Sequence, residues 1–194
     1  MNVGIIGSGG REHAICVSIK QSVKVKNIYC IPGNAGTDQI ASNVDLDINN
    51  FNKIKEFVVS KKVDLLIIGP EKPLADGLVD FLNDLNIKIF GPNKLASQLE
   101  GSKIFTKNLC EKYKIPTAKF GVFKNKQDSK EFLNKSDFPI VIKADGLAAG
   151  KGVYICENEK VSFNAVDEIF NGKFGEAKNI LIEEFLDGEE MSFF

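Results

Sequence analysis

Glycines and lysines are concentrated between residues 140 and 155, where two apolar, β-branched runs flank a glycine-rich segment. Such runs predict two strands joined by a loop. The glycines and lysines of this segment are Lys143, Gly146, Gly150, Lys151 and Gly152. Glycine lets backbone N–H groups approach and surround an anion, and the lysines add positive charge. The segment therefore predicts a binding loop for a polyphosphate.

Two other interpretations of this loop need to be weighed. An ordinary glycine-rich hairpin with incidental lysines is the simpler one. A P-loop is the other, but it needs four residues between its glycines and then Lys followed by Ser or Thr. Here three residues separate Gly146 from Gly150, and Gly152 follows Lys151. The segment also leads into a predicted strand rather than a helix, so we expect a flap between two antiparallel strands.

The composition sets limits on the class of protein. The 194 residues suffice for one large or two small domains, with 43% hydrophobic and 26% charged residues. A formal net charge of -1 argues against nucleic acid binding by bulk electrostatics. No apolar run approaches the ~20 residues of a membrane span, and a strand-like run at residues 3–6 leaves no room for a signal peptide. We expect neither nucleic acid nor membrane as a partner.

The four cysteines are scattered and form no CxxC pair. This spacing fits neither a zinc site nor a disulfide framework. Reduced thiols in a cytoplasmic protein are therefore expected.

The first half of the chain alternates between strand-like and helix-like segments. Strands are predicted at residues 3–6, 27–31, 45–48, 64–68 and 88–90, and helices at residues 11–21, 50–61 and 73–85. This alternation predicts an α/β fold with an open parallel sheet and helices on both faces. Ligands of such sheets bind beyond the C-terminal ends of the strands, where the loops at residues 7–11, 32–37 and 69–71 should converge.

The first of these loops resembles a dinucleotide-binding turn only in part. Gly7 and Gly9 follow a strand and precede a helix, but Glu12 occupies the third glycine position. The second strand also ends without an acidic residue, so a nicotinamide cofactor is not expected. The start of the helix still suits a phosphate. Arg11 is the better candidate ligand there because a guanidinium binds phosphate bidentately, whereas His13, the single histidine, is more often structural at such a position.

The second half begins near residue 98. Ser102 is a candidate N-cap for a helix to about residue 112, on which Lys103 and Lys107 share one face. A solvated basic face is the ordinary interpretation of that pair. Further helices are predicted at residues 128–134 and 158–170, and a strand at residues 179–186. That strand ends in Glu183 and Glu184, an arrangement usually found at a solvated strand end.

Five motifs resemble those of one enzyme family. The segment KADGLAAGKG (residues 143–152) closely resembles the ATP-grasp phosphate loop of the phosphoribosylamine–glycine ligases, also called glycinamide ribonucleotide synthetases. The segments GGREHA (9–14), PGNAGT (32–37), GPEKPL (69–74) and SKIFTK (102–107) resemble other parts of the same family. The resemblance implies a Rossmann-like substrate-binding domain over residues 1–100 (a pre-ATP-grasp domain). It also implies the first part of an ATP-grasp domain, with an antiparallel-sheet lid, over residues 101–194.

The resemblance also implies roles for individual residues. The lysines at 103 and 143 would neutralise phosphate oxygens, the glycine loop would close over the γ-phosphate, backbone groups near Glu184 would read the adenine edge, and Glu190 would accept the ribose hydroxyls. The implied ATP-binding residues are Lys103, Lys143, Gly146, Gly150, Lys151, Gly152, Glu183, Glu184, Phe185, Leu186 and Glu190. The implied phosphoribosylamine-binding residues are Gly9, Gly10, Arg11, Glu12, Asn34 and Glu71.

The implied reaction joins glycine to 5-phosphoribosylamine with ATP, through glycyl phosphate, in purine biosynthesis. Mg²⁺ or Mn²⁺ would assist, but the family's metal ligands correspond to positions beyond residue 194. The chain ends on Phe193 and Phe194, which predicts truncation. We therefore expect no metal ligand and no confidently assigned catalytic residue within the 194 residues, which should be inactive alone. The alternatives are another ATP-grasp ligase or carboxylase, or a non-catalytic nucleotide-binding fragment.

Overall fold

The computed structural model describes residues 1–146, 151–175 and 179–193 and divides the chain into two compact units. The first unit is Met1–Gln98 and the second is Leu99–Phe194. Helix α5 (Lys94–Gly101), which the sequence did not predict, contains the boundary. Within the described ranges, no helix is both long and apolar enough to cross a membrane.

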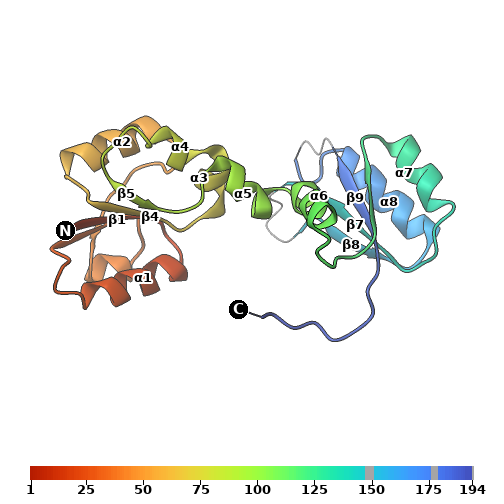
Figure 1. The fold of residues 1–194 in the computed structure, drawn as a ribbon, viewed down its shortest axis with the longest axis horizontal. Coiled ribbons are helices and arrows are strands. Elements are labelled where there is room, and N and C mark those ends of the chain that lie inside the picture. Colours follow the sequence, from red (N-terminus) through yellow and green to blue (C-terminus); the bar gives the residue numbers. More distant parts are fainter. Residues whose placement is uncertain (147–150, 176–178, 194) are drawn as a thin grey trace. The chain divides into compact units, whose positions relative to one another are not determined.

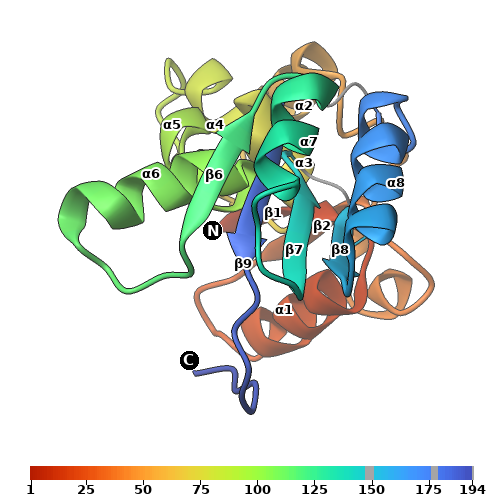
Figure 2. The ribbon, with the colours of Figure 1, turned by 90° about the vertical axis from the view of Figure 1, so that its right-hand side faces the viewer.

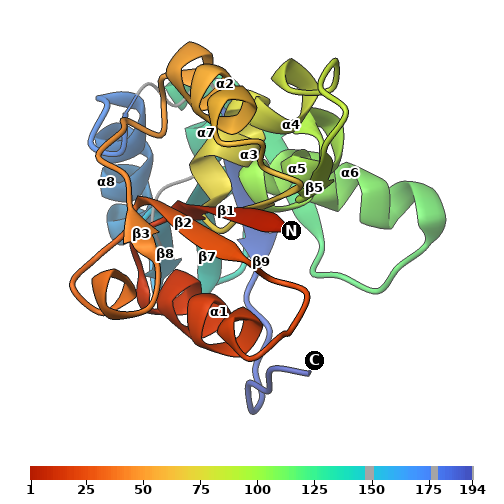
Figure 3. The ribbon, with the colours of Figure 1, turned by 90° about the vertical axis from the view of Figure 1, so that its left-hand side faces the viewer.

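The first unit is built on a parallel sheet (Figures 1 and 3). Its strands lie in the order β3-β2-β1-β4-β5, and every neighbouring pair is parallel. The strands are β1 (Asn2–Gly7), β2 (Asn27–Pro32), β3 (Ser42–Asn43), β4 (Leu65–Ile68) and β5 (Lys88–Phe90). From β1 the chain adds β2 and β3 on one side, and then β4 and β5 on the other side. The loops after the neighbouring strands β1 and β4 therefore meet at one edge of the sheet.

Helices cover both faces of this sheet, which confirms the predicted architecture. Successive residues of β1 point to opposite faces, so Ile5 and Ile6 belong to different cores. The core with Ile5 includes Cys16 of α1 (Gly10–Lys20). The core with Ile6 includes residues of three helices, α2 (Phe51–Ser60), α3 (Glu71–Asp76) and α4 (Leu78–Phe81).

Two predicted elements of this unit are wrong. The expected strand at residues 45–48 is absent, and the paired strand is the shorter β3. Val44, Leu46 and Ile48 alternate because they pack in part against the core, not because they join the sheet. The expected helix at residues 73–85 is two short helices, since Gly77 adopts a left-handed conformation (φ 100°) that ends α3.

The second unit contains an antiparallel sheet (Figure 2). Its order is β6-β9-β7-β8, with β6 (Phe120–Phe123), β7 (Ile140–Ala144), β8 (Val153–Cys156) and β9 (Ile180–Glu184). Helices α7 (Lys126–Leu133) and α8 (Glu159–Phe170) contribute to the core with Ile142 of β7 and Ile182 of β9. The predicted antiparallel pairing of the strands on either side of the glycine segment is confirmed. Strand β6 was not predicted.

Helix α6 (Lys103–Tyr113) begins at the predicted N-cap. The Ser102 hydroxyl accepts a hydrogen bond from the backbone N–H of Phe105 at 3.1 Å. The same hydroxyl donates to the Asp145 carboxylate at 3.1 Å, and Asp145 also accepts from the backbone N–H of Ile104 at 3.2 Å. Asp145 therefore ties the start of α6 to the end of β7.

Substitution of Ser102 by alanine should lower the free energy of unfolding by about 1 kcal/mol, because the first turn of α6 loses its cap. Chemical denaturation of the ligand-free protein measures this. Ser60→Ala is the matched control, since the Ser60 hydroxyl only donates to the carbonyl of Phe57 near a helix end. Equal denaturation midpoints for the two variants would contradict the prediction.

Candidate substrate and nucleotide sites

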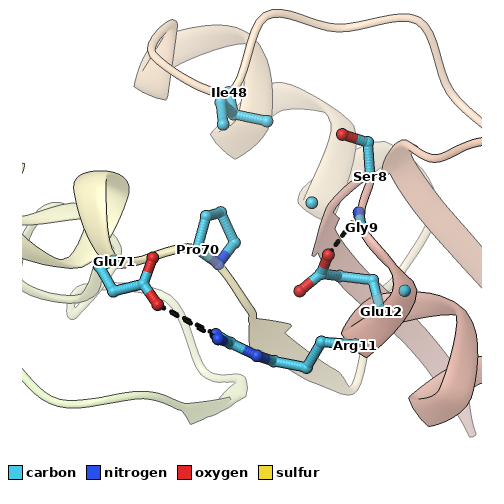
Figure 4. A pocket seen from close by; sticks show the side chains of 9 residues that line it. Ser8, Gly9, Arg11, Glu12, Ile48, Pro70 and Glu71 are labelled. Carbon is cyan, nitrogen blue, oxygen red and sulfur yellow. Dashed lines mark hydrogen bonds and ion pairs between the residues drawn. The ribbon is translucent and has the colours of Figure 1, made fainter. Parts of the chain in front are cut away.

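A pocket of about 440 Å³ lies at the edge of the first sheet where β1 and β4 end (Figure 4). The first and third predicted loops line most of it, as the parallel topology requires. The lining residues are Gly7, Ser8, Gly9, Gly10, Arg11, Glu12, Ile48, Pro70 and Glu71. Five of the six predicted substrate residues are among them, three in the first loop, Glu12 just after it in α1, and Glu71 in the third loop. Asn34, from the loop after β2, is not among the lining residues.

The Glu12 carboxylate is almost buried within this pocket, with 5% of the residue exposed. Its Oε2 accepts a hydrogen bond from the backbone N–H of Gly9 at 2.6 Å. A Cβ atom on Gly69 would lie 2.0 Å from Glu12 Oε1, and one on Gly7 would lie 2.6 Å from Glu12 Cδ. A side chain at either position would therefore force the Glu12 carboxylate to move. Glu12 stands at the sequence position where the dinucleotide-binding fingerprint has its third glycine.

Arg11 lies at the mouth of the pocket with a half-exposed partner, Glu71 (Figure 4). Its Nη1 donates to the carbonyl of Gly69 at 2.7 Å and to Glu71 Oε1 at 3.2 Å. The backbone N–H of Glu71 itself, and then the Arg11 guanidinium, hold the pKa of this carboxyl below its ordinary value. Arg11 itself belongs to the first turn of α1, where backbone N–H groups also favour an anion.

The side chain of Asn34 holds the first loop through hydrogen bonds to its backbone carbonyls. Its Nδ2 donates to the carbonyls of Ser8 at 2.8 Å and Gly9 at 3.3 Å. Its Oδ1 accepts from the backbone N–H groups of Gly36 at 2.8 Å and Thr37 at 3.0 Å. All four hydrogen-bonding positions of this amide are occupied. In this structure the Asn34 side chain positions the first loop (residues 7–11). Its contact with a substrate stays a prediction.

In the second unit, both predicted phosphate lysines lie near the start of the glycine segment. Lys103 Nζ donates to the carbonyl of Gly146 at 2.9 Å. Lys143 belongs to β7, and its Nζ donates to Glu183 Oε2 at 2.9 Å. Gly152 accepts from the backbone N–H of Ala144 at 2.8 Å, and Lys151 is exposed. The predicted contact at Gly150 lies outside the described residues.

The predicted adenine segment begins at the end of β9. Glu183 is buried, whereas Glu184, Phe185, Leu186 and Glu190 are exposed. Glu184 Oε1 accepts from the backbone N–H of Lys119 at 2.8 Å, and the backbone N–H of Glu184 donates to the Lys119 carbonyl at 3.0 Å. Both bonds fix the end of the strand from which this segment leaves.

Lys107 lies in surroundings that the sequence did not predict. Its Nζ lies 2.7 Å from Thr117 Oγ1, 3.1 Å from the carbonyl of Ala118 and 3.5 Å from Glu183 Oε1. The helical spacing placed it on the same face as Lys103, but a solvated basic face was the ordinary interpretation. Here the Lys107 side chain is mostly buried.

The described residues include no group of three or more His, Cys, Asp or Glu residues that could hold a metal ion.

Both halves of the chain match models of a single enzyme family. Residues 1–100 match the phosphoribosylglycinamide synthetase N domain, and residues 101–194 match the phosphoribosylglycinamide synthetase ATP-grasp (A) domain. Phosphoribosylamine–glycine ligase of Mesorhizobium japonicum is 47% identical over 195 residues, which cover 100% of this chain and 46% of that protein. This chain thus spans about half the length of the curated relatives it matches.

Solved structures agree with this assignment. The phosphoribosylamine–glycine ligase of Thermotoga maritima superposes with a TM-score of 0.78 at 32% identity, over 97% of this chain and 45% of that one. The biotin carboxylase domain of a Hydrogenobacter thermophilus 2-oxoglutarate carboxylase has a TM-score of 0.73 at 17% identity, over 95% of this chain and 44% of that one, and shares the fold alone. The chain therefore belongs to the phosphoribosylglycinamide synthetase family.

Proposed function

We propose that this chain forms the phosphoribosylamine-binding and nucleotide-binding parts of an ATP-dependent ligase. The enzyme would join glycine to 5-phosphoribosylamine and release glycinamide ribonucleotide, ADP and phosphate. The observation that carries this proposal is the match of the two units, in order, to the two domains of one family. The family match and the curated relatives support a role in purine biosynthesis.

The pocket of the first unit suits a small sugar phosphate. Its phosphate would lie at the N-terminus of α1, where the backbone N–H of Gly10 and the Arg11 guanidinium can bind an anion. Carboxylates accept hydrogen bonds from hydroxyl and amine groups, so Glu12 and Glu71 are suited to the rest of phosphoribosylamine. Asn34 would act by holding the loop that carries these groups.

The second unit is proposed to bind ATP. Lys103 and Lys143 would neutralise phosphate oxygens, and the glycine segment at residues 146–152 would close over the γ-phosphate and exclude water. Backbone groups of residues 184–186, which follow Glu183, would contact the adenine edge, and Glu190 would accept hydrogen bonds from the ribose hydroxyls. A divalent cation, Mg²⁺ or Mn²⁺, would neutralise further phosphate charge. The described residues do not fit such an ion, so its ligands are proposed to lie outside them.

The proposed chemistry needs no nucleophilic side chain. The glycine carboxylate oxygen attacks the γ-phosphorus of ATP, and ADP leaves with the electrons of the broken P–O bond. The amine of phosphoribosylamine then attacks the acyl carbon of glycyl phosphate, loses a proton and displaces phosphate. The task of the protein is to position reactants, stabilise charge and exclude water, because an acyl phosphate hydrolyses readily.

We also propose a cytoplasmic location, with small molecules as the binding partners. The structure keeps all four cysteines as free thiols, three of them buried. Burial raises the pKa of the Cys16 thiol to about 12 and that of Cys156 to about 11. Such thiols are unreactive and suit a reducing compartment.

The test is the reaction of the full-length protein with ATP, glycine and phosphoribosylamine. We expect ADP and phosphate in equal amounts, with one glycinamide ribonucleotide formed for each, only when all three substrates are present. Release that requires bicarbonate instead of glycine would favour an ATP-grasp carboxylase. Binding of ATP without turnover by any of these substrates would favour a non-catalytic nucleotide-binding protein.

A further inference from the structure

Three charged side chains meet at one face of the second sheet: Lys107 of α6, Lys143 of β7 and Glu183 of β9. We infer that Lys107 is a positioning residue that neutralises Glu183 and so leaves the positive charge of Lys143 available for a nucleotide phosphate. This inference rests on the proposed binding of ATP by the second unit. Lys107 itself would not touch the nucleotide.

The strand register places two of these charges together. In the antiparallel pair of β7 and β9, Lys143 lies opposite Leu181 and Val141 lies opposite Glu183. Lys143 and Glu183 are therefore diagonal neighbours on the same face of the sheet, within reach of each other's side chains. Their Nζ and Oε2 atoms are 2.9 Å apart.

The third charge reaches the carboxylate from the other side. Lys107 Nζ is 3.5 Å from Glu183 Oε1, the oxygen that Lys143 does not bind. Glu183 Oε1 is buried and, among the described residues, has no hydrogen-bond partner. The ammonium of Lys107 is thus the charge that compensates this oxygen.

The Lys107 ammonium is held by groups of the protein. A lysine ammonium carries three N–H donors. Two of them form hydrogen bonds, to Thr117 Oγ1 at 2.7 Å and to the Ala118 carbonyl at 3.1 Å, and Glu183 Oε1 lies 3.5 Å from Nζ as an ion-pair partner. The ring of Phe120 covers it further, with Nζ 5.5 Å from the ring centroid.

Exposure separates the roles of the two lysines. The side chains of Glu183 and Lys107 are 5% and 12% exposed, whereas that of Lys143 is 28% exposed. Lys143 is therefore the member of the cluster that an anion from solvent can reach.

The charge count explains why a second lysine is needed. Two ammonium groups and one carboxylate leave one positive charge in the cluster. Without Lys107, Lys143 would be the single counter-ion of a buried carboxylate, and turning it toward a phosphate would leave that carboxylate unpaired. With Lys107 in place, Glu183 remains compensated when Lys143 binds the nucleotide.

The test is calorimetric titration of the full-length protein with ATP and Mg²⁺, and separately with adenosine, which lacks phosphate. Lys107→Met should weaken ATP binding roughly tenfold, because the cluster loses its surplus charge. The affinity for adenosine should stay within about twofold. Lys107→Met combined with Glu183→Gln should return the ATP affinity to within about threefold of wild type, since the surplus charge is restored.

Lys130→Met is the matched control. Lys130 also combines an ion pair, to Asp167 at 2.7 Å, with a position over an aromatic ring, Phe163 at 5.3 Å. It belongs to α7 and pairs with Asp167 of α8, and both helices pack on the face of the sheet opposite to Lys143 and Glu183, so its loss should leave ATP affinity unchanged. If Lys107→Met fails to fold, the double variant alone decides, and weak ATP binding by it overturns the inference.

The outcomes separate this inference from the proposed function. A wild-type protein that does not bind ATP overturns both. A wild-type protein that binds ATP, with Lys107→Met equally tight, overturns the inference alone. So does an equal loss of ATP and adenosine affinity, which would mean that Lys107 shapes the adenine pocket. A double variant as weak as Lys107→Met would mean direct contact with the nucleotide and would also overturn it.

Discussion

Replacement of Lys143 by alanine should impair the use of ATP by roughly ten- to hundredfold while the protein remains folded. A charge-assisted contact with a phosphate contributes about 1.5–3 kcal/mol, and 1.4 kcal/mol corresponds to a factor of about ten. The fold should survive because Glu183 keeps Lys107 as a counter-ion when Lys143 is removed. The measurements are the Michaelis constant for ATP, the turnover number, ATP affinity by calorimetry and the thermal unfolding temperature.

Lys135→Ala serves as the control for this substitution, because it removes an exposed lysine of the same unit that lies just past α7 and precedes β7, whose other end leads into the glycine segment. Its kinetics should match wild type. An unchanged Michaelis constant and turnover for ATP in Lys143→Ala would refute the assignment of Lys143 to the phosphates.

Replacement of Arg11 by alanine should weaken the use of phosphoribosylamine by roughly tenfold or more, while ATP affinity stays near wild type. Arg11 lines the pocket of the first unit, at the start of α1, and the nucleotide loop belongs to the other unit. Arg11→Lys should recover only part of the loss, because an ammonium lacks the planar fork of a guanidinium. The Michaelis constants for phosphoribosylamine and ATP, with calorimetry for ATP, measure this separation.

Loss of the ion pair with Glu71 should contribute little to the result, because both partners are largely exposed. Lys72→Ala tests that point, since it removes an exposed ion pair with Asp76 in the same unit. Arg11→Ala would show that the first loop belongs to the nucleotide pocket if it lost ATP affinity as Lys143→Ala does and kept its use of phosphoribosylamine.

The architecture of the first unit was predictable because strand and helix periods alternate over segments of ordinary length. The convergence of the first and third loops then follows from parallel topology alone. The two wrong elements occur where the side-chain pattern does not determine the conformation of the backbone. An apolar alternation at residues 44–48 reflects packing against the core, and a single glycine, Gly77, divides a segment whose composition suits one helix.

The charged cluster of the second unit could not be predicted in the same way. Lys143 and Glu183 are 40 residues apart in sequence, and only the register of β7 against β9 makes them diagonal neighbours. Periodicity indicates that Lys107 shares a face with Lys103, but not what that face contacts. The role of Asn34 was equally hidden, because a turn-forming sequence does not show which carbonyl groups its amide will bind.

The glycines packed around Glu12 impose an order on the substitutions that this pocket can accept during evolution. Alanine at position 69 conflicts with the Glu12 carboxylate, so it should become acceptable only after a shorter side chain has replaced Glu12. Position 7 differs, because Gly7 has φ 127° and would strain any other residue whatever occupies position 12. The tolerance of position 69 thus depends on the residue at position 12, which is epistasis, whereas that of position 7 depends on its own backbone conformation. A comparison of related sequences should find position 69 variable where Glu12 has changed, and position 7 constant.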